Sequence, residues 1–217
     1  MKLVYLSTSL MWAVTLVVSS PSRLDLRQED GVPEGYTIQP LVFTGRIEAD
    51  GPNVTLSGDA QSIYNQILEL NPNYDPTVFP EYIANQQIAA DAMARKRSDA
   101  GALFKRDRIE CGHGERISQS DLACPPQLRM LNNIQGLCEV GARACARTAC
   151  GNQCGVWLCN DNTFPVGVWC PNIAGDGLDI ANECTWRDDL GIVSTLHGRI
   201  WRDLGHGWNV QVSRCTL

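Results

Sequence analysis

Short stretches of hydrophobic residues, separated by turn-forming residues, predict the elements of the first half of the chain. Residues 41–47 (LVFTGRI) predict a strand, with a bend or bulge at Thr44-Gly45. Residues 49–53 (ADGPN) are dense in residues that favour turns, and residues 54–56 predict a returning strand. The first half is therefore expected to contain a strand–turn–strand unit.

A helix is predicted directly after this unit. Ser57 and Asp59 are candidate N-terminal caps, and Asn71-Pro72 ends the helix because the residue before a proline is disfavoured in helical conformation. Three apolar residues recur in it at helical spacing: Ile63, Ile67 and Leu70. Residues 86–97 are alanine-rich and predict a second helix, which is marginal in isolation.

Two more helices are predicted in the second half. The first follows Pro125-Pro126, because proline is tolerated in the first helical turn, and its expected end is Gly141. Its apolar stripe has four members: Leu128, Leu131, Ile134 and Leu137. Residues 171–184 predict the second of these helices, although Gly175 and Gly177 weaken the pattern.

Three strands are predicted among these helices. Residues 155–159 (GVWLC) form a short apolar run that is followed by the turn residues Asn160-Asp161-Asn162. Residues 195–201 and 208–212 predict two strands joined by residues 202–207. Aromatic packing is expected to come mainly from five tryptophans, with a sugar-stacking or partner surface as the alternative role: Trp157, Trp169, Trp186, Trp201 and Trp208.

The cysteines divide the chain into two parts. None precedes the dibasic pair Lys105-Arg106, and the part that follows has the cysteine density of a disulfide scaffold. Such cross-links stabilise a small domain by restricting its unfolded chain. The ten expected disulfide residues are Cys111, Cys124, Cys138, Cys145, Cys150, Cys154, Cys159, Cys170, Cys184 and Cys215.

The N-terminus has the layout of a secretory signal peptide. A positive charge at Lys2 precedes a mostly apolar run, residues 3–18, and small residues follow at Ser19-Ser20. The run is short and interrupted for a membrane span, and the competing interpretation is a buried N-terminal helix. We therefore expect a signal peptide at residues 1–20, an extracellular protein and no membrane span.

Secretion favours paired thiols over a metal site. An even number of cysteines in an oxidising compartment predicts disulfides, whereas the same number in the cytosol would suggest metal. Four closely spaced cysteines, from Cys145 to Cys159, offer a zinc cluster as the alternative, but no histidine lies between Cys138 and Cys184. We expect no metal and no cofactor.

Two dibasic pairs predict proteolytic maturation. They are Lys96-Arg97 and Lys105-Arg106, and the only other lysine is Lys2. A processing protease of the secretory pathway is thus an expected partner, with residues 21–106 as a pro-segment and residues 107–217 as the mature cysteine-rich domain. The alternative is ordinary surface charge.

The expected fold class is α+β: a small disulfide-rich domain with one or two helices packed on a short antiparallel sheet, preceded by a partly ordered pro-segment. Asn53-Val54-Thr55 is an acceptor for N-glycosylation, expected in the turn of that segment.

The sequence gives only weak support for a catalytic site. His113-Gly114-Glu115-Arg116 groups an imidazole, a carboxylate and a guanidinium, which small ribonucleases use, and His197 or His206 would supply a second proton-transfer group. The alternative is a solvated loop. Acidic side chains outnumber arginines in residues 107–217, which disfavours a nucleic-acid partner. We therefore expect no catalytic residues.

Nucleophilic and glycosidic chemistry are also weakly supported. None of the four serines of the expected mature domain lies in a G-x-S-x-G motif: Ser118, Ser120, Ser194 and Ser213. A pair of carboxylates for glycoside hydrolysis would have to come from Asp176, Asp179, Asp188 and Asp189. Asp188-Asp189 is more simply interpreted as a turn before a strand.

Three segments carry a resemblance: residues 145–150 (CARTAC), 154–162 (CGVWLCNDN) and 208–215 (WNVQVSRC). With them, residues 120–217 resemble a large group of fungal small secreted cysteine-rich proteins. The stretch LVFTGRIEADGPNVTLSGDAQSIYNQI is similar to pro-peptides of kexin-processed fungal secreted proteins. Cys154 and Cys170 are additional to the group's pattern. The resemblance implies an effector-like or toxin-like virulence protein that acts outside the cell, and it brings no catalytic residues.

The leading hypothesis is a secreted, non-enzymatic binding protein whose partner is a host or competitor protein or a glycan. A rigid, cross-linked surface loses less entropy on binding. The alternatives are a small secreted ribonuclease that uses His113 and Glu115, and a carbohydrate-binding module. The candidate binding residues lie at one end of the last hairpin, where Arg and Trp are frequent interface anchors: Arg199, Trp201, Arg202, His206 and Trp208.

Overall fold

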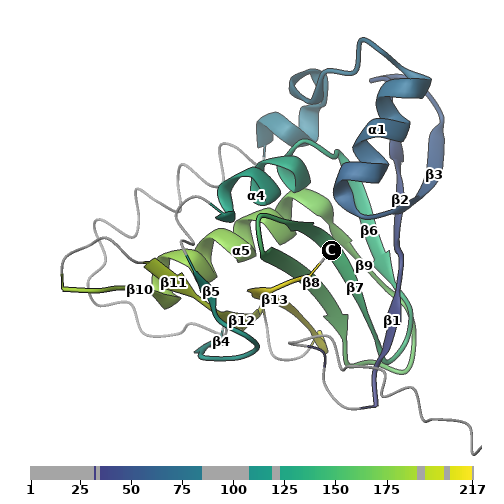
Figure 1. The fold of residues 1–217 in the computed structure, drawn as a ribbon. Coiled ribbons are helices and arrows are strands. Elements are labelled where there is room, and N and C mark those ends of the chain that lie inside the picture. Colours follow the sequence, from purple (N-terminus) through teal and green to yellow (C-terminus); the bar gives the residue numbers. More distant parts are fainter. Residues whose placement is uncertain are drawn as a thin grey trace, which may run out of the picture.

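The computed structural model describes residues 32, 35–84, 108–118, 123–189, 194–202 and 206–216 (Figure 1). The expected signal peptide, the alanine-rich helix at residues 86–97 and both dibasic pairs lie outside these residues. The described part confirms an α+β fold in which helices pack on mainly antiparallel sheets.

The largest sheet has six strands and joins the two halves of the chain. β1 pairs with β7 in parallel, and the other neighbours are antiparallel. The expected hairpin of the last two strands is confirmed, because β12 pairs with β13. In spatial order the strands are β1 (Thr37–Gln39), β7 (Ala144–Gly151), β8 (Cys154–Asn160), β13 (Trp208–Arg214), β12 (Gly198–Trp201) and β4 (Arg108–Cys111).

A second sheet also combines both halves. Its central strands β2 and β6 pair with each other, and every neighbouring pair is antiparallel. The spatial order is β3 (Asn53–Gly58), β2 (Leu41–Arg46), β6 (Gly136–Val140) and β9 (Val166–Trp169). A smaller sheet consists of β10 (Thr185–Arg187), β11 (Ser194–Leu196) and β5 (Ile117–Ser118).

The helices follow the expected apolar patterns in part. The predicted ends of the first helix are confirmed: of the two candidate N-caps, Asp59 accepts a hydrogen bond from the Ser62 amide, and Asn71 is the C-cap. The other candidate, Ser57, lies in β3. The helix predicted at residues 171–184 is also confirmed, and its Gly177 leaves room for the Leu128 side chain of the neighbouring helix. The elements are α1 (Ala60–Leu70), the 3₁₀ turn η1 (Pro76–Val78), α4 (Pro125–Asn132) and α5 (Cys170–Cys184), with α4 and α5 side by side (Figure 1).

All ten cysteines form disulfides, as expected from their even number. Eight of these residues are buried. Three of the bonds tie α5 or the N-terminal end of α4 to a strand, and the other two join β7 to β8 and to the residue that follows β13. The pairs are Cys111–Cys184, Cys124–Cys154, Cys138–Cys170, Cys145–Cys159 and Cys150–Cys215.

The predicted helix from residue 125 to Gly141 is wrong in its second half. The helix ends at Asn132, and Leu137 lies in strand β6 with 40% of its surface exposed. The apolar spacing continued past the helix by coincidence. The chain extends there because β6 gains hydrogen-bonded partners on both sides, β2 and β9.

Three smaller predictions also need correction. No bulge occurs at Thr44-Gly45, because β2 and β3 pair in continuous register. The strand predicted at residues 195–201 is interrupted at His197, so that β11 and β12 belong to different sheets. Asn53 is exposed but is the first residue of β3 and does not lie in the preceding turn.

The tryptophans differ in burial more than expected. Among the described tryptophans, Trp157 on β8 is the one that is fully buried, with 1% of its surface exposed. It packs in a core cluster with the disulfide-bonded Cys145 and Cys159. Trp169, Trp201 and Trp208 are half-buried. Trp186 is 71% exposed, so the expectation that it packs in the core is wrong; it lies on β10, in the small peripheral sheet.

Candidate functional site

An arginine–tryptophan cluster lies on one face of the outer strand pair β12–β4. Arg199 and Trp201 are two residues apart on β12 and therefore point to the same face. Their antiparallel partners on β4 are Glu110 and Arg108, respectively. We call these four residues the Trp201 cluster.

The cluster is held by directed contacts. Arg199 donates two hydrogen bonds to Glu110 Oε2, from Nε at 3.0 Å and from Nη2 at 2.8 Å. Its guanidinium carbon lies 4.4 Å from the centroid of the Trp201 ring, and that of Arg108 lies 5.3 Å from it. Two cations therefore lie within cation–π range of one indole.

Electrostatics keep the carboxylate of this cluster ionised. The hydrogen bond from Arg199 is the main cause that holds the pKa of Glu110 below its usual value, and the charges of Arg199 and Arg108 act in the same direction. A depressed folded-state pKa means that the carboxylate stays ionised to a lower pH than an ordinary glutamate, and that the stability from this pairing is lost as pH falls through the lowered pKa. The cluster therefore stays assembled in mildly acidic surroundings.

The sequence prediction of a hairpin-end surface placed five residues together, and the structure separates them. Arg199 and Trp201 share the cluster, but Arg202 turns to helix α5, where it contacts the carboxylates of Asp176 and Asp179. His206 is exposed next to the start of β13, and Trp208 pairs with Asn160 of β8 and packs against the core.

The loop that carries the candidate ribonuclease residues is fastened on both sides. The Glu115 carboxylate accepts a hydrogen bond from Arg214 of β13 at 3.0 Å. His197 Nδ1 lies 2.9 Å from the carbonyl oxygen of Gly114. The carboxylate proposed as a general base is thus already engaged by a guanidinium of β13.

Comparisons with known proteins were made for the whole chain. The sequence matches no family model, no curated protein and no solved structure. Any functional conclusion therefore depends on the residues and geometry of this chain.

Among the described residues, no group of three or more His, Cys, Asp or Glu side chains is arranged to hold a metal ion. None of the helices in the described part is long and apolar enough to cross a membrane.

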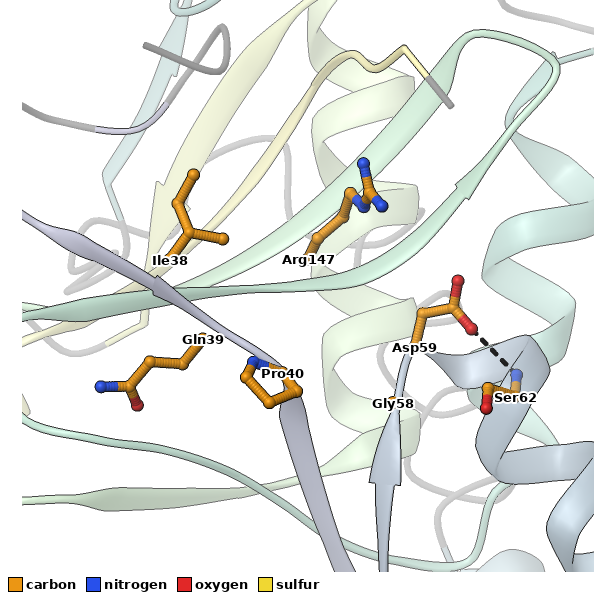
Figure 2. Close-up of a pocket in the computed structure, with 7 residues that line it drawn as sticks. All are labelled: Ile38, Gln39, Pro40, Gly58, Asp59, Ser62 and Arg147. Carbon is orange, nitrogen blue, oxygen red and sulfur yellow. Dashed lines mark hydrogen bonds between the residues drawn. The ribbon is translucent and has the colours of Figure 1, made fainter. Parts of the chain in front are cut away.

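The seam between the N-terminal segment (residues 35–84) and the cysteine-rich half was not predicted from the sequence. An open cavity of about 490 Å³ lies on it, lined by Ile38, Gln39, Pro40, Gly58, Asp59, Ser62 and Arg147. Figure 2 shows Arg147 of β7 beside residues of the N-terminal segment, with the Asp59–Ser62 cap at one end. The six other lining residues belong to that segment, so the N-terminal segment forms most of the cavity wall.

The hydroxyl group of Tyr74, which can titrate, makes a contact across this seam. Burial is the main cause that raises its pKa to about 12, from an ordinary value of 10.0. Its hydroxyl donates to the Asn133 carbonyl at 3.0 Å and accepts from the Gln135 amide at 3.1 Å. Both partners lie in the connection between α4 and β6.

This contact should weaken in alkali. A raised folded-state pKa contributes stability below pH 10 that is lost as pH rises towards 12, at most about 3 kcal/mol for a shift of this size. Urea unfolding after brief exposure to each pH is expected to show this loss. Tyr74→Phe should start less stable and lack that part of the alkaline decline; an unchanged decline in the variant would contradict the assignment.

Proposed function

We propose that this protein is a secreted, proteolytically matured and disulfide-stabilised effector-like or toxin-like protein that acts by binding an extracellular or host target. The five disulfides and the absence of a membrane-spanning helix among the described residues are consistent with an extracellular protein. Cleavage after Arg106 would make Asp107 the first residue of the cysteine-rich chain.

The Trp201 cluster is the observation that carries the binding proposal. Trp and Arg dominate the energetics of protein interfaces, and here their side chains are positioned before any partner arrives. Arg199 is held by Glu110, so its immobilisation is already complete in the free protein. A partner would meet a half-buried indole edged by two guanidinium groups.

The cluster also lies next to the proposed cleavage point. Arg108, which stacks near Trp201, is two residues beyond Arg106. Cleavage would therefore place a new α-amino group one residue before Arg108. Maturation would in this way add positive charge close to this surface.

Binding is tested with the protein from culture supernatant, whose intact mass should correspond to a chain that begins at Asp107 and has no free thiols. Labelled protein is titrated onto plant and fungal cell surfaces. Trp201→Ala is expected to weaken saturable binding at least about tenfold, as for an interface hot spot. Trp186→Ala is the matched control, because that tryptophan is more exposed but lies on β10, outside the cluster.

The same preparation separates the alternatives. Hydrolysis of RNA that is lost in His113→Ala would contradict the binding proposal in favour of a ribonuclease. Equal loss of cell binding in Trp201→Ala and Trp186→Ala would show that the cluster is not the binding surface. A full-length extracellular species with reduced thiols would contradict maturation.

A further inference from the structure

The N-terminal segment supplies strands that the cysteine-rich half lacks. β2 is an inner strand of the four-stranded sheet, where it aligns Phe43 with Cys138 and Thr44 with Leu137 of β6. β1 extends the six-stranded sheet by parallel pairing, with Ile38 opposite Cys145 of β7. Without the segment, β6 and β7 would each present an unpaired edge.

The segment also shares the main hydrophobic core. Its buried side chains belong to the same cluster as residues of α4, β6 and the connection between them. Fully buried members from the segment are Leu41, Phe43, Ile63 and Ile67, and those from the other half include Leu131, Ile134 and Cys138. Separation of the two parts would expose both surfaces to water.

Phe43 is the most specific of these contacts. It is fully buried, and its ring lies against two glycines that face each other across the strand pair, Gly45 and Gly136. A Cβ atom at Gly45 would lie 2.6 Å from the Phe43 ring, and one at Gly136 would also clash with that ring. One glycine from each half therefore forms the socket for the ring.

Polar contacts fix the same interface at three places. The Tyr36 hydroxyl donates to Asp161 at 2.8 Å, and the Gly141 amide donates to the Gln39 side chain at 3.2 Å. The Thr37 amide donates to the Arg143 carbonyl at 3.2 Å. Together with those of Tyr74, these bonds are spread along the segment from Tyr36, just before β1, to Tyr74, just before η1. No disulfide contributes, because all ten cysteines follow Arg106.

We propose that residues 35–84 stay bound after cleavage as a second, non-covalent chain, so that the mature protein is a heterodimer of the N-terminal segment and the cysteine-rich chain. This inference rests on the maturation step of the proposed function. It changes the role of the segment from a discarded leader to a subunit, and it keeps the seam cavity and both extended sheets in the working molecule.

The test uses purified full-length protein that is cut in vitro with a protease specific for dibasic pairs. Size-exclusion chromatography and native mass spectrometry should then show both fragments in one 1:1 species, which denaturing conditions resolve into two. Elution of the fragments as separate species under native conditions would overturn the proposal. Because the cut is made in vitro, failure of cells to process the protein would contradict the proposed function and leave this result intact.

Two variants test whether the described interface holds the fragments together. Phe43→Ala should raise the dissociation constant of the cut complex about a hundredfold or more, because it empties the glycine socket. Leu70→Ala is the matched control, since Leu70 is in the same segment but 56% exposed, and it should change the constant less than about threefold.

Tyr74→Phe provides a second measurement if Phe43→Ala fails to fold as the full chain. It removes only the hydroxyl that bridges to Asn133 and Gln135, and it should weaken the cut complex about tenfold. A complex whose dissociation constant is unaffected by Tyr74→Phe, as by Leu70→Ala, would overturn the assignment of this interface.

Discussion

Replacing both Cys111 and Cys184 by alanine is expected to lower the free energy of unfolding by about 4 kcal/mol, the largest loop-entropy contribution among the five disulfides. The bond joins residues with a sequence separation of 73, and the entropy removed from the unfolded chain grows with loop length. It ties the edge strand β4 to the end of α5. Equilibrium urea unfolding of the intact chain measures the loss.

The Cys145–Cys159 bond is the comparison for this prediction. It spans a separation of only 14 within the β7–β8 pair, so its cross-linking contribution should be about 3 kcal/mol. Both of its cysteines are fully buried, and the alanine variant will add a packing loss that the exposed Cys111 does not. A loss below about 1 kcal/mol for the Cys111–Cys184 variant would show that the bond does not restrict the unfolded chain.

Arg202→Leu is expected to destabilise the protein by about 3 kcal/mol, because it takes the guanidinium away from a carboxylate in the interior. The Asp176 side chain is only 5% exposed and lies on α5, together with Asp179, the second partner of Arg202. The ion pairs fasten the end of β12 to that helix. Thermal or urea unfolding of purified variants measures the change.

Two further variants separate this effect from loss of an ordinary surface charge. Arg214→Leu breaks an ion pair whose two side chains are 40% and 39% exposed, and it should cost less than about 1 kcal/mol. Adding Asp176→Asn to Arg202→Leu should restore part of the stability, since an amide is less costly to bury than a carboxylate. Equal losses for the two arginine variants would contradict an interior role for Asp176.

Local signals were sufficient for the elements whose stability is local. Helix α1 was predicted from its apolar spacing and both ends, since the Asp59 cap and the Asn71-Pro72 stop act within a few residues. Helix α5 and strand β8 were also predicted. Strand β6 was missed because its conformation is decided by β2 and β9, which lie far away in the chain.

Only two of the four residues of the Trp201 cluster were predicted from the sequence. Residue type pointed to Arg199 and Trp201, but their partners Arg108 and Glu110 were not expected, because the pairing of β12 with β4 is long-range. A signal was present: Arg108 and Glu110 flank the half-buried Ile109, which is the alternation of a strand with one polar face. The integration of the N-terminal segment had no comparable signal, because the glycine socket of Phe43 forms only in the assembled sheet.

The parallel pairing of β1 with β7 has a consequence for the order of events during synthesis. The N-terminal strands leave the ribosome first, but Tyr36 meets its partner Asp161 only after a further 125 residues have been made. Until then Phe43 and the apolar residues around it in the nascent segment lack the strands that cover them, which favours aggregation of this intermediate. Refolding of the two isolated halves, whichever half is added first, should therefore be slower and more prone to aggregation than refolding of the joined chain.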